Sequence, residues 1–173
     1  MKQAKIIVYE DNEQDLITRY SCLTERPDRY DVHIRHPLKP IMPTSAQAGE
    51  WNPKKFSKHG FNPDNFQEGY WLREGETADV YFLDGLGGYC FTLLEEGLPR
   101  DRTFIYSGDD NIIDQARREG YNVVDDSVDK IVATILLKDL FTVDQKDLRR
   151  TMREIEAKNR RRLTHISRKL KKI

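Results

Sequence analysis

Short apolar runs alternate with amphipathic stretches along most of the chain. The apolar runs are three to six residues long and rich in β-branched and aromatic side chains, which is typical of buried strands. Five of them predict strands: Lys5–Tyr9, Tyr30–Arg35, Ala78–Leu83, Thr103–Tyr106 and Asn122–Val124. Helical patterns follow at residues 13–25, 89–96, 111–119 and 127–141. Strands that alternate with helices form βαβ units, so the pattern predicts an α/β fold with a five-stranded parallel sheet.

One segment interrupts this alternation. Residues 36–77 separate the second and third predicted strands, which is far longer than a crossover needs. The pattern predicts the crossover helix at Asp64–Leu72 and leaves an insertion at about 37–63. The segment holds both tryptophans and several phenylalanines, a composition that argues against disorder. Two interpretations stay open, a loop packed on its own domain and a partner-binding or lid element.

Polar residues follow the predicted strands at their carboxyl ends. Glu10 and Asp11 follow the first strand, Asp84 follows the third, and Ser107 follows the fourth. In an open α/β sheet this edge is where ligands bind. If the first and third strands are neighbours, the three carboxylates converge and repel one another. A hard divalent cation such as Mg²⁺ would then stabilise them best.

The same residues resemble a known family, the receiver domains of response regulators. Ile6–Asn12 resembles the first receiver strand with its acidic pair, and Val80–Asp84 resembles the strand that carries the phosphoacceptor aspartate. Phe104–Gly108 resembles the strand that carries the Ser/Thr switch residue. The resemblance covers about residues 4–36 and 78–141.

This resemblance implies a flavodoxin-like receiver fold and a role in two-component signalling in the cytoplasm. Glu10, Asp11 and Asp84 would hold Mg²⁺, and Asp84 would accept a phosphoryl group from a histidine kinase. Ser107 would move toward the phosphorylated aspartate and transmit the change. The chemistry is sound, because a bound metal neutralises phosphoryl oxygens while a carboxylate attacks in line.

The sequence also departs from the receiver pattern. Receivers carry a lysine after the fifth strand, whereas Asp125, Asp126 and Ser127 stand at that place here and Lys130 comes about one helical turn later. Two alternatives therefore remain beside a working phosphoacceptor. One is a pseudo-receiver that is not phosphorylated and serves as an assembly or nucleic-acid-associated module. The other is a Mg²⁺-dependent phosphotransfer or hydrolytic enzyme similar to Toprim domains. We expect a regulatory protein rather than an enzyme.

Charge is distributed unevenly along the chain. The 29 basic and 29 acidic residues give a net charge of zero. Residues 142–173, however, hold twelve Lys/Arg and four Asp/Glu, a net charge of +8, so residues 1–141 carry −8. The segment 142–173 has no Gly or Pro, which allows one long helix. We therefore expect a receiver-like domain at 1–141 and a basic amphipathic helix or coiled coil at 142–173.

Three functions are open for this basic tail. Apolar residues recur at spacings of three and four over 148–173, a pattern that favours a homodimeric coiled coil or a partner helix. The basic faces could instead contact nucleic acid, or fold back on the acidic body. The residues that we expect to contact nucleic acid or a partner are Arg149, Arg150, Arg153, Arg160, Arg161, Arg162, Arg168 and Lys169.

Composition excludes several other classes. No apolar stretch is long enough for a membrane span, and the N-terminal residues lack the apolar core of a signal peptide, so we expect no membrane contact and a cytoplasmic location. The two cysteines, Cys22 and Cys90, exclude a disulfide framework or a cysteine-rich zinc site.

Overall fold

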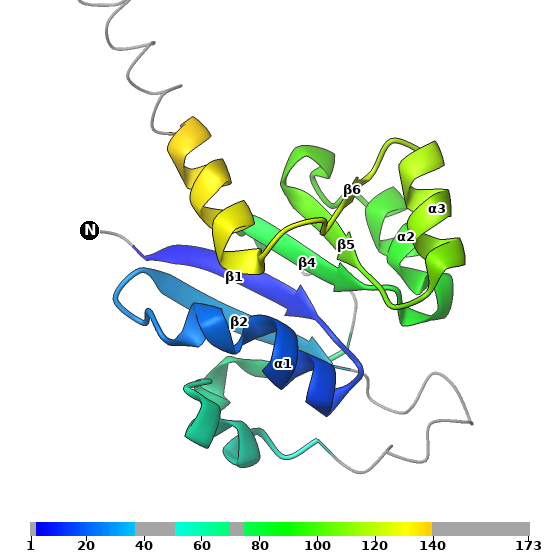
Figure 1. The fold of residues 1–173 in the computed structure, drawn as a ribbon. Helices are drawn as coiled ribbons and strands as arrows, with labels where there is room; N and C mark the ends of the chain where they lie inside the picture. The colour runs from blue at the N-terminus through cyan, green and yellow to red at the C-terminus, as the bar shows by residue number, and fades with distance from the viewer. Residues whose placement is uncertain (1–2, 37–50, 70–74, 140–173) are drawn as a thin grey trace, which may run out of the picture. The chain divides into compact units, whose positions relative to one another are not determined.

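The computed structural model describes residues 3–36, 51–69 and 75–139 of the 173-residue chain (Figure 1). The chain divides into two compact units, Met1–Ile135 and Leu136–Ile173. The fold and the site described below belong to the first unit. The predicted tail at 142–173, with all eight basic residues expected to contact a partner, lies outside the described residues.

A six-stranded, all-parallel sheet forms the centre of the first unit. The strands are β1 (Ala4–Tyr9), β2 (Tyr30–His36), β3 (Phe66–Glu68), β4 (Val80–Asp84), β5 (Thr103–Tyr106) and β6 (Asn122–Val123). Their order is β3-β2-β1-β4-β5-β6. The predicted α/β class and parallel sheet are confirmed, and the five predicted strands all form. Without β3 the order is that of flavodoxin-like folds. The predicted number of strands was wrong by one.

The additional strand, β3, lies where the sequence pattern predicted a crossover helix at Asp64–Leu72. A short 3-10 turn at Pro63–Asn65 precedes it, and the chain is then extended. The Asn65 amide donates to the Asp31 carboxylate (2.9 Å) and to the Val32 carbonyl (3.0 Å), which fixes the chain beside β2. Phe66 then pairs with Ile34, so ladder hydrogen bonds replace helical ones.

Helices cover both faces of the sheet (Figure 1). They are α1 (Glu13–Thr24), α2 (Tyr89–Glu95), α3 (Asp110–Arg118) and, within the first unit, the helical residues 128–135. The buried stripe of α1 packs against one face, where the Tyr20 ring meets the Phe82 ring. On the other face, α2 and α3 bury a core with Ile7 and Leu83. None of the helices in the described part of the chain is long and apolar enough to cross a bilayer.

The described part of the insertion packs against the domain itself. The Trp51 ring stacks on the His36 ring (4.9 Å between centroids), and Phe56 packs between Trp51 and Phe66. The Thr24 hydroxyl of α1 donates to the His59 carbonyl (2.6 Å). Residues 51–65 are therefore a satellite of the core beside α1 and β2, whereas 37–50 lie outside the described residues.

The connection from β3 to β4 is a short strap rather than a helix over its described residues, 75–79. Glu76 forms ion pairs with the buried Arg35 of β2 and with Lys5 of β1 (3.3 Å). Burial alone would raise the pKa of Glu76, but the two cations outweigh it and lower that pKa. The strap thus ties the two strands together on the face that α2 and α3 share.

Candidate functional site

The predicted acidic residues meet at the carboxyl edge of the sheet. β1 and β4 are neighbours in register, with Tyr9 beside Leu83, so Glu10 and Asp84 follow the pair side by side. Ligand atoms of Glu10, Asp11 and Asp84 lie within 4.8 Å of one another. The chain turns away from this point in opposite directions, to β2 after β1 and to β5 after β4, which is the usual ligand-binding position in such sheets. We call these three residues the acidic cluster.

Glu10 is the buried member of the acidic cluster, with 0% of its side chain exposed. Its Oε1 accepts hydrogen bonds from the backbone N–H groups of Asp11 and Asn12, both at 3.1 Å. Burial, and after it the charge of Asp84, raise the pKa of Glu10 well above its ordinary value, and Arg19 opposes the rise. A buried carboxylate of this kind needs a cation nearby.

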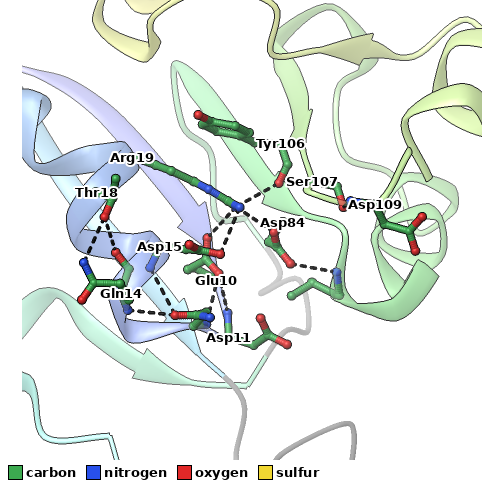
Figure 2. Close-up of polar contacts among 12 residues, drawn as sticks. Glu10, Asp11, Gln14, Asp15, Thr18, Arg19, Asp84, Tyr106, Ser107 and Asp109 are labelled. Atoms are coloured by element: carbon green, nitrogen blue, oxygen red, sulfur yellow. Dashed lines mark hydrogen bonds and ion pairs between the residues drawn. The ribbon is translucent and has the colours of Figure 1, made fainter. Parts of the chain in front are cut away.

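Arg19 of α1 supplies that cation, as Figure 2 shows. Its Nη1 donates to Asp84 Oδ1 at 2.9 Å, to Glu10 Oε2 at 3.3 Å and to the Tyr106 carbonyl at 3.2 Å. Its Nη2 pairs with Asp15 at 3.0 Å. Burial alone would lower the pKa of Arg19, but the surrounding carboxylates outweigh it and raise that pKa. The guanidinium is therefore a permanent cation within the cluster.

Arg19 was not among the site residues predicted from the sequence, because its position on α1 gives only a weak signal. Leu16, Tyr20 and Leu23 form the buried stripe of α1, and position 19 borders that stripe. A long cationic side chain there can reach along the sheet edge. The spacing of Asp15 and Arg19 alone indicated only an ordinary surface ion pair.

Asp84 is held at both carboxylate oxygens. Oδ1 accepts from Arg19, and Oδ2 accepts from the Leu86 backbone N–H at 3.1 Å. The loop that supplies this N–H is tightly wound, because Leu86, Gly87 and Gly88 have φ values of 48°, 61° and 95°. Positive φ at a leucine is uncommon, and such strain concentrates at functional sites.

Asp11 is the exposed member of the acidic cluster. Partial burial of its carboxyl, and after it the charge of Asp84, raise the pKa of Asp11. The helix that follows is capped by Asn12, whose Oδ1 accepts from the Gln14 and Asp15 N–H groups. Asp11 is thus not needed as the helix cap.

Ser107 lies against the loop that follows Asp84. A methyl group built on Gly85 would stand 2.4 Å from Ser107 Oγ, so the two residues touch. The hydroxyl accepts a hydrogen bond from the Asp109 N–H at 3.1 Å, which shapes the entry to α3. The structure therefore places the predicted switch residue beside Gly85, the residue that follows the predicted phosphoacceptor, and its part in switching stays a prediction.

Exposed acidic side chains follow β6, at the position where receiver domains carry a lysine. Asp125 and Asp126 are exposed after β6, and Lys130 pairs with Asp126. The Asp126 carboxylate thus engages the first lysine that follows β6. Arg19, from the opposite end of the sequence, is the cation that meets Asp84.

The three carboxylates have the chemistry of a metal site. Carboxylate and carbonyl oxygens suit hard cations such as Mg²⁺, Ca²⁺ and Mn²⁺, and the acidic cluster could hold one. The Arg19 guanidinium, however, contacts one carboxylate oxygen of Glu10 and one of Asp84. Comparison of the chain with protein-family models, with curated proteins and with solved structures found no match.

Proposed function

We propose that the protein is a receiver-like regulatory module that acts by binding partners and is not phosphorylated at Asp84. The parallel sheet and the acidic cluster at its carboxyl edge support the receiver-like character. The observation that carries the proposal is the ion pair between Arg19 and Asp84. It gives the cluster an internal cation where phosphoryl transfer requires an external metal.

Three features of the cluster make phosphoryl transfer unfavourable. Both oxygens of Asp84 accept hydrogen bonds, one of them from the Arg19 guanidinium, and this withdrawal of electron density makes the carboxylate a weaker nucleophile. The metal would have to enter beside the Arg19 guanidinium, which repels it. A lysine that could neutralise the transferred group is replaced by exposed carboxylates at Asp125 and Asp126. Each feature raises the barrier, and together they favour a pseudo-receiver.

Beryllofluoride with Mg²⁺ tests this proposal, because it mimics an acyl phosphate. We expect the amide NMR spectrum of the wild-type protein to stay unchanged around residues 84 and 107. Asp84→Asn is the matched variant, and Asp110→Asn, which changes an exposed carboxylate on the first turn of α3, is the control. Shifts around residue 84 that are present in the wild type and in Asp110→Asn, but absent in Asp84→Asn, would overturn the proposal.

A second candidate function is a working phosphoacceptor with Mg²⁺. The convergence of three carboxylates within 4.8 Å, with Ser107 against Gly85 directly after Asp84, favours it. In this case the Arg19 side chain would have to leave the cluster when the metal arrives. The beryllofluoride experiment separates the two candidates, because only a phosphoacceptor responds through Asp84.

We assign partner binding to the basic tail at 142–173, as the charge pattern predicts. Homodimer formation through 148–173 and nucleic-acid binding are the two outcomes to separate. Replacement of Arg160, Arg161 and Arg162 by glutamine removes three positive charges from the full-length protein. A loss of salt-dependent RNA or DNA binding would identify a nucleic-acid contact. An unchanged dimer in sedimentation, without nucleic-acid binding in either protein, would identify self-association.

A further inference from the structure

We infer that Arg19 is a built-in counter-ion that decides whether the acidic cluster accepts a divalent cation. This inference rests on the proposed function, because it explains why the cluster of a receiver-like module would not use a metal. It assigns to one side chain of α1 the control over what the carboxyl edge of the sheet can bind.

The guanidinium contacts the same kind of ligand set that a metal would use. Nη1 meets a carboxylate oxygen of Glu10, a carboxylate oxygen of Asp84 and the Tyr106 carbonyl within 3.3 Å. Carboxylate and carbonyl oxygens are the preferred ligands of hard divalent cations. A divalent cation in contact with the same oxygens would be repelled strongly by the guanidinium, so its binding at this place favours displacement of Arg19.

The guanidinium is also held from its other side, so it is not a loose surface group. Its Nη2 pairs with Asp15, and its central carbon lies 4.4 Å from the centre of the Tyr106 ring. The Tyr106 ring in turn packs edge-on against the buried Tyr20 (6.3 Å between centroids). Only 13% of the Arg19 side chain is exposed. Charge pairs that are withdrawn from water in this way are stronger than exposed ones.

Removal of the guanidinium would leave the acidic cluster without its counter-ion. The buried Glu10 would then face Asp84 with only backbone N–H groups as partners on Oε1. Two carboxylates whose oxygens lie within 4.8 Å of each other favour binding a cation or taking up a proton. Because Asp11 borders the same space and is exposed, a cation can enter from solvent.

Manganese titration of full-length variants tests the inference, with free Mn²⁺ followed by electron paramagnetic resonance. The wild type should leave Mn²⁺ free at millimolar concentration. Arg19→Gln should bind it at least about tenfold more tightly, equivalent to about 1.4 kcal/mol. Arg19→Gln with Asp84→Asn should lose the gain. Arg118→Gln, which removes an exposed arginine of α3, is the charge-matched control and should behave like the wild type.

Two further measurements keep the inference open to refutation. Arg19→Lys retains the positive charge in a smaller group, so it should exclude Mn²⁺ nearly as well as the wild type; a gain equal to that of Arg19→Gln would overturn the inference. If Arg19→Gln does not fold, Mn²⁺ broadening of wild-type amide signals decides the matter. Broadening around residues 10 and 84 would overturn the inference, and its absence would support it.

Failure of this inference is distinguishable from failure of the proposed function. In one outcome, the wild type does not bind Mn²⁺ alone but responds through Asp84 to beryllofluoride with Mg²⁺. This outcome would contradict only the proposed function, because the added anion then displaces Arg19. An Arg19→Gln variant that folds and gains no Mn²⁺ binding, with a wild type silent to beryllofluoride, would contradict only the inference.

Discussion

Gly85 directly follows β4 and lies against Ser107, which directly follows β5, so its replacement by alanine should destabilise the protein. A methyl group at this position would stand 2.4 Å from Ser107 Oγ, 3.0 Å from Ser107 Cβ and 2.9 Å from Ile112 Cδ1. Distances below 3.0 Å force the neighbours to move. The Gly85 backbone itself is ordinary, with φ −61° and ψ −28°, so the expected cost comes from crowding and not from backbone strain.

The size of the cost follows from how firmly the neighbours are held. Ser107 is fixed by its hydrogen bond from Asp109 and by the pairing of β4 with β5, whereas the Ile112 methyl can rotate away. Overpacking of this kind costs about 1–3 kcal/mol. The reduced freedom of the unfolded chain offsets it by about 0.4–1 kcal/mol. We therefore expect a net loss of about 1–2 kcal/mol in the free energy of unfolding.

Urea unfolding measures this loss as a shift of the midpoint at constant slope. With a slope of about 2 kcal/mol/M, the midpoint should fall by about 0.5–1 M. Gly108→Ala is the matched control, because a methyl group there meets nothing within 4 Å, and it should leave the midpoint unchanged or slightly raised. Ser107→Gly should partly rescue Gly85→Ala. Equal midpoints for Gly85→Ala and Gly108→Ala would refute the reasoning.

Three other changes test separate parts of the structure. Burial, and after it the charge of Asp84, raise the pKa of Glu10 in the folded protein. Above about pH 4.3 the unfolded protein therefore binds fewer protons than the folded protein. The free energy of unfolding should consequently fall as the pH rises toward the raised pKa of Glu10. Glu10→Gln should remove this pH dependence. Urea midpoints of the wild type and of Glu10→Gln at about pH 5 and about pH 8 measure it, and an equal change in the two proteins would contradict the prediction. Phe56→Ala should cost about 3–5 kcal/mol in urea unfolding, because Phe56 is 1% exposed among three aromatic rings; a smaller loss than that of Phe104→Ala would be evidence against a packed insertion. Burial raises the pKa of Cys90 to about 12, so iodoacetamide should leave it unmodified in the native protein by mass spectrometry, and fast modification without unfolding would disprove its burial.

The sequence was sufficient to predict five of the six strands and the edge where polar residues gather. The runs around Ile7, Phe82 and Ile105 are apolar on both faces, which only a covered parallel strand requires. The polar residues directly after them could therefore be placed at one edge. The convergence of Glu10 with Asp84 followed once β1 and β4 were neighbours, as the flavodoxin-like order implies.

Two features could not be predicted for physical reasons. β3 has only three residues and includes Gln67 and Glu68, so no hydrophobic pattern marks it, and side-chain bonds from Asn65 position it instead. The contact of Arg19 with Asp84 joins residues 65 positions apart. It depends on the rotation of α1 about its axis and on the packing of Tyr106, which local sequence patterns do not contain.

The central position of β1 in the sheet has a consequence for folding during synthesis on the ribosome. β1 pairs with β2 on one side and with β4 on the other, but β4 begins about 70 residues later in the chain. Because synthesis proceeds at about 5–20 residues per second, the edge of β1 that pairs with β4 stays unpaired for several seconds. Ala4–Tyr9 is therefore the segment that holdase chaperones should capture first. A circular permutation that brings β4 next to β1 in time should shorten that exposure and reduce aggregation during synthesis.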